Sequence, residues 1–446
     1  MDRSLLRERD LRVLWHPCTQ MQDHEQHPPV PIRQGHGSWL EDFEGHRYLD
    51  GISSWWVNLF GHANPRINAA IAAQLEVLEH VLLAGFTHEP VITLSERLIR
   101  IAPPGLTRCF YAESGSAAIE IALKMSLHYW RNEGEPGRTR FVSLKHAYHG
   151  ETVGALALGD VGLYRAPYES LLPSWPKAES PAGSGCPDDP AQTERAAEDL
   201  ERLLFANAGA ICAVAVEPLV QCAGGMRMYP AQYLSRVREL CSRYRVHMIA
   251  DEIAVGFGRT GTLFGCEQAN VTPDFLCIGK GLTGGYLPLS ACLTTDTVYR
   301  AFYGGGTARA FLHSHSYTGN PLACAAAIAT LSIFEEDDVL TRNRALSAHL
   351  AQRLHDLKTH PHVMNVRQTG LIAALDLVAH KESRTPYPAE ERRGRRVCER
   401  ALTRGALLRP LGDVLYLMPP YVVTPDEIDQ LVDALSDGID YATEAG

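Results

Sequence analysis

Several short apolar runs in this chain end at a polar or charged residue. They are residues 275–278 before the turn Gly279–Lys280, residues 247–250 before Asp251, and residues 213–216 before Glu217. Continuous apolar runs of this length favour strands buried on both faces, as in a parallel sheet. Open α/β sheets bind their ligands at the carboxyl ends of such strands. The pattern therefore predicts a site along the ends of these three runs.

A second informative segment covers residues 108–130. Residues 108–111 predict a strand, residues 113–116 a turn, and residues 117–130 a helix with apolar positions four apart. Small residues such as Gly115 and Ser116 at a strand-to-helix turn leave backbone N–H groups free at the positive end of the helix, which suits a phosphate. The alternative is an ordinary helix start capped by Ser114 or Ser116.

The alternation of strands and helices predicts an α/β fold with a mostly parallel central sheet. Strands after residue 360 predict a smaller α+β domain. We expect an N-terminal segment over 1–60 that packs with the small domain, a large domain over 61–335 and the small domain over 336–446. Residues 173–192 are rich in Pro, Gly, Ser and Ala and predict a surface excursion.

Composition narrows the classes of protein. The 446 residues are 45% apolar and 21% charged, and the net charge of −10 argues against a nucleic-acid binder. The eleven cysteines are scattered without a Cys-x-x-Cys pair, which predicts reduced thiols and a cytoplasmic protein. No run of about eighteen apolar residues predicts a membrane span.

Lys280 and Asp251 together indicate one chemistry. A partly desolvated lysine has a lowered pKa and can act as nucleophile and base. A lysine that forms a Schiff base with pyridoxal phosphate, and an aspartate that holds the pyridine nitrogen protonated, fit these two strand ends. Taken alone, Lys280 is more typical of a solvated surface turn. The two histidines in 145–150 have no acidic or cysteine partner at metal-site spacing, so we predict no metal there.

Three motifs carry a family resemblance. Residues 249–253, residues 256–261 and the Lys280 turn resemble the class III aminotransferases in order and spacing, and the match covers about residues 14–436. Within that class the chain is most similar to the diaminopelargonate aminotransferases of biotin synthesis. Segments 15–17, 53–56, 145–150, 319–324 and 408–410 carry this narrower likeness.

The resemblance implies a fold-type-I pyridoxal-phosphate-dependent homodimer with active sites at the subunit interface. It also implies ping-pong transfer of an amino group from S-adenosylmethionine to the keto acid 8-amino-7-oxononanoate, giving 7,8-diaminononanoate. The implied catalytic residues are Lys280 and Asp251. The implied cofactor-binding residues are Gly115, Ser116, Tyr148, Asp251, Lys280, His315 and Ser316, with Ser316 reaching the phosphate of the partner subunit. The implied substrate-binding residues are Cys18, Trp55, Trp56, Tyr148, Arg259, Lys280, Ser314 and Arg409.

Two departures from the family pattern bear on the donor and on the phosphate loop. Cys18 stands where members that use adenosylmethionine typically carry a tyrosine, so lysine is an alternative amino donor. The segment 314–316 reads Ser-His-Ser where the family typically has Gly-Pro-Thr, and Ser316 keeps the hydroxyl. The residues are also compatible with a different class III ω-aminotransferase and with a non-catalytic binding protein on the same scaffold. A nucleotide-binding α/β enzyme is disfavoured because the chain lacks its phosphate-loop motifs.

Overall fold

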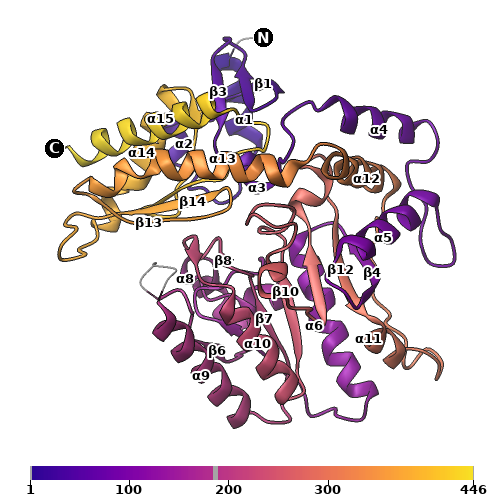
Figure 1. The fold of residues 1–446 in the computed structure, drawn as a ribbon. Helices are drawn as coiled ribbons and strands as arrows, with labels where there is room; N and C mark the ends of the chain where they lie inside the picture. The colour runs from indigo at the N-terminus through magenta and orange to yellow at the C-terminus, as the bar shows by residue number, and fades with distance from the viewer. Residues whose placement is uncertain (1–2, 184–188, 445–446) are drawn as a thin grey trace.

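The computed structural model describes residues 3–183 and 189–444. Within these residues, a seven-stranded sheet forms the centre of the larger part of the molecule (Figure 1). Its strands, in spatial order, are β4 (Leu106–Ala112), β12 (Ser290–Thr295), β11 (Phe275–Ile278), β10 (His247–Asp251), β7 (Ile211–Val216), β5 (Arg140–Leu144) and β6 (Lys177–Ala178). Neighbouring strands from β11 to β6 are parallel, and β12 is antiparallel to both of its neighbours. The predicted mostly parallel sheet is confirmed.

The strand β7 shows why its apolar run is continuous. Val214 packs into a cluster with side chains of α9 (Pro190–Ala206) and α10 (Gln232–Arg243) on one face of the sheet. Ala213 packs into a cluster with α6 (Gly115–Asn132) on the other face. Since successive side chains of a strand point to opposite faces, a sheet covered by helices on both faces needs apolar residues throughout.

The N-terminal segment and the C-terminal part of the chain share a second sheet. Its strands, in order, are β1 (Ile32–His36), β2 (Trp39–Asp42), β3 (Arg47–Asp50) and β15 (Ala406–Leu407). The parallel pairing of β3 with β15 joins residues more than 350 apart in the sequence.

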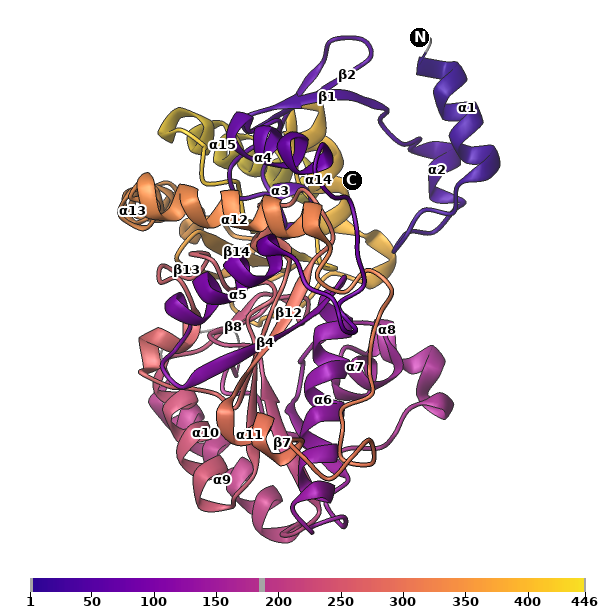
Figure 2. The same cartoon turned by 90° about the vertical axis from the view of Figure 1, so that its right-hand side faces the viewer.

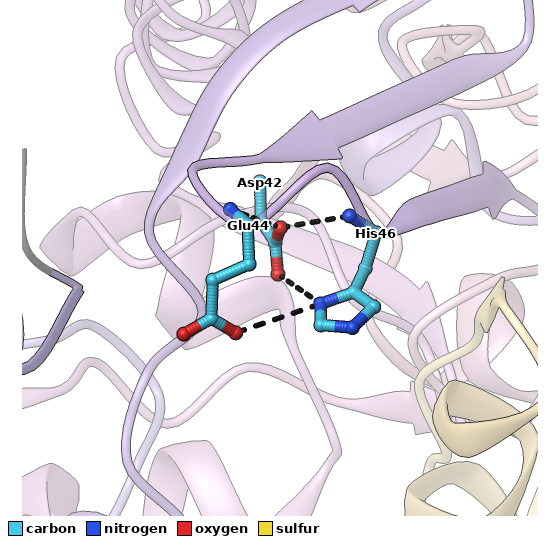
Figure 3. Close-up of side chains that lie close together, drawn as sticks. All are labelled: Asp42, Glu44 and His46. Carbon is cyan, nitrogen blue, oxygen red and sulfur yellow. Dashed lines mark hydrogen bonds and ion pairs between the residues drawn. The ribbon is translucent and has the colours of Figure 1, made fainter.

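The hairpin turn between β2 and β3 gathers three potential metal ligands, Asp42, Glu44 and His46, within 4.8 Å of one another (Figure 3). Asp42 is buried, and its Oδ1 accepts the backbone N–H groups of Glu44 at 2.8 Å and His46 at 3.0 Å. Its Oδ2 lies 3.2 Å from the His46 ring and accepts the Tyr48 hydroxyl at 3.0 Å. These bonds lower the Asp42 pKa to about 2, although burial acts in the opposite direction. The hairpin turn therefore accounts for the cluster.

A third, antiparallel sheet belongs to the C-terminal part of the chain. It consists of β13 (Val363–Thr369), β14 (Ile372–Leu377) and β16 (Val414–Leu417), next to α13 (Val339–Leu354), α14 (Arg393–Thr403) and α15 (Pro425–Thr443). These three strands all lie after residue 360, where the sequence predicts strands. The last helix begins with a capping box, in which Thr424 Oγ1 accepts the Glu427 N–H at 3.2 Å and the Glu427 carboxylate accepts the Thr424 N–H at 2.9 Å.

Two long helical segments are each divided in the structure. Residues 65–101 contain α4 (Pro65–Leu75) and α5 (Glu89–Ile101), and α12 (Pro321–Glu336) is separated from α13 by Asp338 with φ +45°. The surface excursion predicted over 173–192 contains the edge strand β6 and the start of α9, and its residues 184–188 lie outside the described residues.

Most of the remaining elements are short. They are α1 (Arg3–Val13), α2 (Asp23–Gln26), α3 (Ser53–Trp56), α7 (Val153–Leu158), α8 (Gly162–Arg165), α11 (Asp296–Ala301), β8 (Val220–Gln221), β9 (Arg227–Met228) and the 3-10 helices η1 (Ala166–Leu171), η2 (Gly265–Ala269), η3 (Lys280–Thr283), η4 (Asp356–Thr359) and η5 (Ala389–Glu391). Figure 2 shows α1 and α2 beside the N-terminal strands at one end of the molecule. None of the helices in residues 3–183 and 189–444 is both long and apolar enough to cross a bilayer.

Candidate active site

Three charged residues follow neighbouring strands of the central sheet. Asp251 is the last residue of β10, Glu217 comes directly after β7, and Lys280 follows β11 after one glycine. The strands lie in the order β11-β10-β7 and run parallel. Their carboxyl ends therefore bring the three residues to one edge of the sheet, where α/β folds bind ligands.

Burial changes the electrostatics of this edge. It lowers the pKa of Lys280, although Cys222, Asp251 and Glu217 act in the opposite direction. Burial also raises the pKa of Glu217 well above its usual value, and Asp251 adds to this effect. The Glu217 oxygens accept the backbone N–H groups of Tyr148 and Cys222, both at 3.0 Å. An amine with a lowered pKa is a better nucleophile and base near neutral pH.

Asp251 is held by a buried histidine. His149 Nδ1 lies 2.8 Å from Asp251 Oδ2, and Asp251 Oδ1 accepts the backbone N–H of Ile253 at 3.1 Å. Among the described residues, His149 Nε2 is buried without a hydrogen-bond partner. Because a carboxylate only accepts hydrogen bonds, His149 Nδ1 is the donor in the bond to Asp251.

The start of α6 forms an anion-binding cradle beside this pair. Ser114 is the N-cap, and its Oγ accepts the Ala117 N–H at 3.3 Å. The first N–H groups of an α-helix have no intrahelical partner, and here Gly115 and Ser116 come before the capped Ala117. A Cβ on Gly115 would lie 2.8 Å from the Ile253 side chain, and one on Gly150 (φ +123°) would lie 2.0 Å from Ser116 Oγ. The close packing of these backbones requires both glycines and leaves a positive helix end open to an anion.

One wall of the site is a strained turn. The four residues of α3 have φ values of +52°, +46°, +76° and +72°, so they form a left-handed turn without any glycine. A left-handed conformation costs an L-residue about 1–2 kcal/mol, or roughly 4–8 kcal/mol for four residues. The turn places the Trp56 ring 4.7 Å from Lys280 Nζ and the Trp55 ring 4.5 Å from the Arg409 guanidinium. Strain of this kind is typical of functional sites.

These groups line a cavity of about 1660 Å³. Lys280, Trp55, Trp56, Tyr148, Arg409 and Cys18 all contribute to its walls. Arg409 Nη2 donates to the Cys18 carbonyl at 3.0 Å, which ties the N-terminal segment to the loop after β15. Tyr148 donates its hydroxyl to Glu151 at 2.9 Å, and burial raises the Tyr148 pKa. The cavity thus has an amine at one place in its wall, a guanidinium at another and aromatic rings beside both.

Seven of the predicted site residues do not line this cavity. Gly115, Ser116 and Asp251 lie at the sheet edge and the start of α6, whereas the other four have partners elsewhere or face solvent. Arg259 is 1% exposed and donates to the backbone carbonyls of Pro419 at 2.6 Å and Asn58 at 3.1 Å, so its guanidinium joins segments of the chain. Ser314 and Ser316 are exposed on the loop before α12, and His315 between them pairs with Glu113.

Comparisons with known proteins agree on a family. The aminotransferase class-III model matches residues 20–439. This chain belongs to the class III aminotransferases. An adenosylmethionine-8-amino-7-oxononanoate aminotransferase of Geobacter sulfurreducens is 45% identical over 99% of both chains. The crystal structure of the enzyme of that name from Methanocaldococcus jannaschii superposes with a TM-score of 0.94, at 39% identity and 99% coverage of both chains.

A second kind of structural relative is also similar. A pyridoxal-phosphate-bound amine transaminase from an uncultivated Pseudomonas species matches with a TM-score of 0.92, at 36% identity over 96% of this chain and 99% of the relative. The chain is thus a fold-type-I aminotransferase that depends on pyridoxal phosphate.

The residues at the sheet edge fit this cofactor. The open start of α6 suits its phosphate, and the closely packed Gly115 and Gly150 leave the backbone accessible. Asp251, with His149 behind it, offers a carboxylate for the ring nitrogen. Lys280, whose pKa burial lowers, offers the amine.

Sequence reasoning missed two groups at this edge. His149 was considered only as a metal ligand, because the sequence gives no sign that β10 brings Asp251 to its ring. Cys222, which is buried and close enough to influence Lys280, lies in the short strand-rich segment after β7 and has no motif of its own. The position of Glu217 after β7 was the signal that could have drawn attention to this segment.

Proposed function

We propose that this chain converts 8-amino-7-oxononanoate to 7,8-diaminononanoate in biotin synthesis. One observation carries the proposal: Arg409 and Lys280 line the same cavity, and each faces a tryptophan of the same turn. A keto acid with a long apolar chain needs a cation for its carboxylate, an apolar channel and an amine near its carbonyl. A planar guanidinium binds a carboxylate with two parallel hydrogen bonds.

The proposed roles follow from position. Bound at the sheet edge, pyridoxal phosphate supplies an electron sink for the carbon that loses or gains the amine. Gly115 and Ser116 at the start of α6 bind the phosphate, and Asp251 binds the ring nitrogen. Lys280 would hold the cofactor covalently through its amine, and the same amine would be placed to take and return a proton at the substrate carbon. Tyr148 contacts cofactor and substrate, and its backbone is fixed by the hydrogen bond to Glu217.

S-adenosylmethionine is the proposed amino donor. The names of the relatives at 36–46% identity support it. The cavity of about 1660 Å³ is large enough for a nucleoside-sized donor. Lysine is the alternative, since Cys18 in the wall cannot stack on an adenine ring.

A second candidate function is transamination of simple amines, as in other class III ω-aminotransferases. The similarity to an amine transaminase at 36% identity favours it. Arg409 in the wall counts against it, because an amine without a carboxylate gives the guanidinium no anionic partner.

We also propose a cytoplasmic homodimer with shared active sites and the domain division 1–60, 61–335 and 336–446. The hydroxyl-bearing residues Ser314 and Ser316 support the dimer, because both are exposed and neither lines the cavity of its own chain. Sedimentation of the loaded enzyme tests the dimer, and titration of the cofactor tests the role of Ser316. In Ser316→Ala the affinity for the cofactor should fall, while sedimentation should still show a dimer.

The decisive experiment separates the two halves of the reaction. The loaded enzyme is mixed with S-adenosylmethionine, with lysine or with 1-phenylethylamine, and loss of the visible cofactor absorbance is followed. The form produced is then given 8-amino-7-oxononanoate, and recovery of the absorbance is measured. Bleaching by adenosylmethionine and recovery with the keto acid support the proposal. Bleaching by the simple amine alone, without recovery by this keto acid, overturns it in favour of the second function.

A further inference from the structure

The left-handed turn 53–56 is organised by one buried carboxylate. Asp50, the last residue of β3, is fully buried. Its Oδ1 accepts the backbone N–H groups of Ser54 at 2.9 Å and Ile52 at 3.3 Å. Its Oδ2 accepts the Ser54 hydroxyl at 2.7 Å and lies 3.1 Å from His62 Nε2. Both oxygens are therefore used to fix the chain at and before the middle of the turn.

We propose that Asp50 is a positioning residue, which sets the hand of the turn and thereby places both tryptophans against the two charged groups of the site. Non-glycine residues adopt left-handed conformations only where surrounding contacts over-determine them. Asp50 supplies these contacts, although it lines neither the cavity nor the cofactor site. Trp56 then faces Lys280 and Trp55 faces Arg409.

Apart from the bonds to Asp50, the hydrogen bonds of the turn within the described residues involve its first and last residues. The Ser53 hydroxyl donates to the Met418 carbonyl at 2.7 Å, and Trp56 Nε1 donates to the Tyr416 hydroxyl at 3.1 Å. These bonds fix the first and last residues against the C-terminal part of the chain. Ser54 lies between them and is itself exposed, so its conformation depends on Asp50. Loss of Asp50 should consequently release Trp55 most and Trp56 in part.

The chain contains a matched control. Asp42 is a buried carboxylate of the same hairpin, and it too accepts two backbone N–H groups of a turn (Figure 3). The bonds that Asp42 makes with Glu44, His46 and Tyr48 hold residues 44–48, which lie outside the turn 53–56. Asp42→Asn should cost stability as Asp50→Asn does, without moving the site tryptophans.

The first test needs neither substrate nor turnover. The six tryptophans of the chain are labelled with 5-fluorotryptophan, and Trp55→Phe and Trp56→Phe assign the two site signals in ¹⁹F NMR spectra of the loaded enzyme. In Asp50→Asn, and in Asp50→Ala where it folds, both signals should shift while those of Trp130 and Trp175 stay in place. Unmoved site signals in a folded Asp50 variant, or equal shifts in Asp42→Asn, would overturn the proposal.

A second pair of variants tests the hand of the backbone itself. Ser54→Ala and Ser54→Gly both remove the hydroxyl that Asp50 accepts, but only glycine adopts a positive φ without strain. The Trp55 signal should therefore move more in Ser54→Ala than in Ser54→Gly. Equal shifts in the two variants would show that the hydroxyl matters and the left-handed backbone does not.

The kinetic consequence rests on the proposed function. A site misplaced by about 1 Å can lose about 10²-fold in rate. For Asp50→Asn we expect a comparable loss of kcat/KM with the keto acid, with KM raised because Arg409 loses its stacked ring. If wild-type enzyme does not use this keto acid, the proposed function fails, yet the ¹⁹F spectra still decide the role of Asp50.

Discussion

The active site has two sides, which are built by different means. On one side, Asp251 and Lys280 follow neighbouring strands of a regular parallel sheet. On the other, Trp55 and Trp56 sit on a left-handed turn, and Arg409 and Cys18 come from loops near opposite ends of the chain. The sheet side carries the groups that suit cofactor chemistry, whereas the loop side carries groups that suit the choice of substrate.

This difference has a physical basis. Hydrogen-bonded strands hold the residues at their ends in fixed positions. Proton transfer requires such positions, because the donor and the acceptor must lie within hydrogen-bond distance. Loops and turns vary without disturbing the core, so substrate preference can change on the same scaffold. Changes on the sheet side should therefore remove the reaction, and changes on the loop side should alter which molecules react.

The largest effect is expected at Lys280. Lys280→Ala removes both the group that binds the cofactor covalently and the proton carrier. We expect the visible absorbance of the bound cofactor to change to that of free pyridoxal phosphate and turnover to fall by at least about 10³-fold, since a positioned acid–base group alone contributes about 10²–10⁴-fold. Absorbance spectra and steady-state rates measure both. Persistence of the wild-type spectrum and rate would contradict the assignment.

Glu252 is a residue of the sheet side that we expect to affect the stability of the fold but not the reaction. It is fully buried next to Asp251, but its oxygens accept the N–H groups of Gly265 and Cys266 at 2.8 Å. Burial raises the Glu252 pKa to about 7 against an ordinary 4.5, although these bonds act in the opposite direction. The folded state thus binds a proton at Glu252 more tightly than the unfolded state does. This difference adds about 3 kcal/mol to the free energy of unfolding below pH 4.5, and the added stability is lost as pH rises through 7.

Glu252→Gln should remove this part of the pH dependence. Denaturant unfolding between pH 4.5 and 7.5 should show a smaller decline in the free energy of unfolding for the variant than for the wild type. The rate of the loaded enzyme should change little at neutral pH, because Glu252 bonds to η2 and not to the cavity groups. Parallel stability curves for the two proteins would contradict the raised pKa.

The structure of the sheet side of the site could be predicted from the sequence, whereas that of the loop side could not. The apolar runs before Glu217, Asp251 and Lys280 carry their structure locally, so the parallel strands could be predicted from them. The capping box of Thr424 and Glu427 is also a local pattern, because its two residues are three apart in the sequence. The short pairing of β15 with β3 and the left-handed turn depend on contacts between distant segments, and no local pattern predicts them.

Arg259 shows the limit of motif reasoning. Its motif suggested a second carboxylate-binding residue, yet the guanidinium is buried against the carbonyls of Pro419 and Asn58. The sequence alone cannot distinguish an arginine that faces a cavity from one that joins two segments. Arg409 lies in the cavity wall because β15 ends just before it.

Arg409→Lys should alter substrate use without removing the reaction. Lysine keeps the charge but loses the planar fork that bonds to both carboxylate oxygens. One charged hydrogen bond contributes about 1.5–3 kcal/mol, so we expect KM for the keto acid to rise by about tenfold or more. The half-reaction with a donor should change less. Arg259→Lys is the matched comparison, and a rise in KM for that variant without loss of stability would place the carboxylate at Arg259 instead.

The smallest effect is expected at Cys18, and it bears on the amino donor. Cys18 lies in the cavity wall, and its carbonyl is fixed by Arg409. A tyrosine there could stack on adenine, and an aromatic pair contributes about 0.5–1.5 kcal/mol. Cys18→Tyr should therefore lower the adenosylmethionine concentration needed for half-maximal bleaching by about 2- to 10-fold and leave the keto-acid half-reaction unchanged. Cys18→Ser is the control and should behave as the wild type. If wild-type enzyme and Cys18→Tyr both bleach with lysine and neither bleaches with adenosylmethionine, the residues on the loop side select lysine. Lysine is then the amino donor, and the proposed donor is wrong.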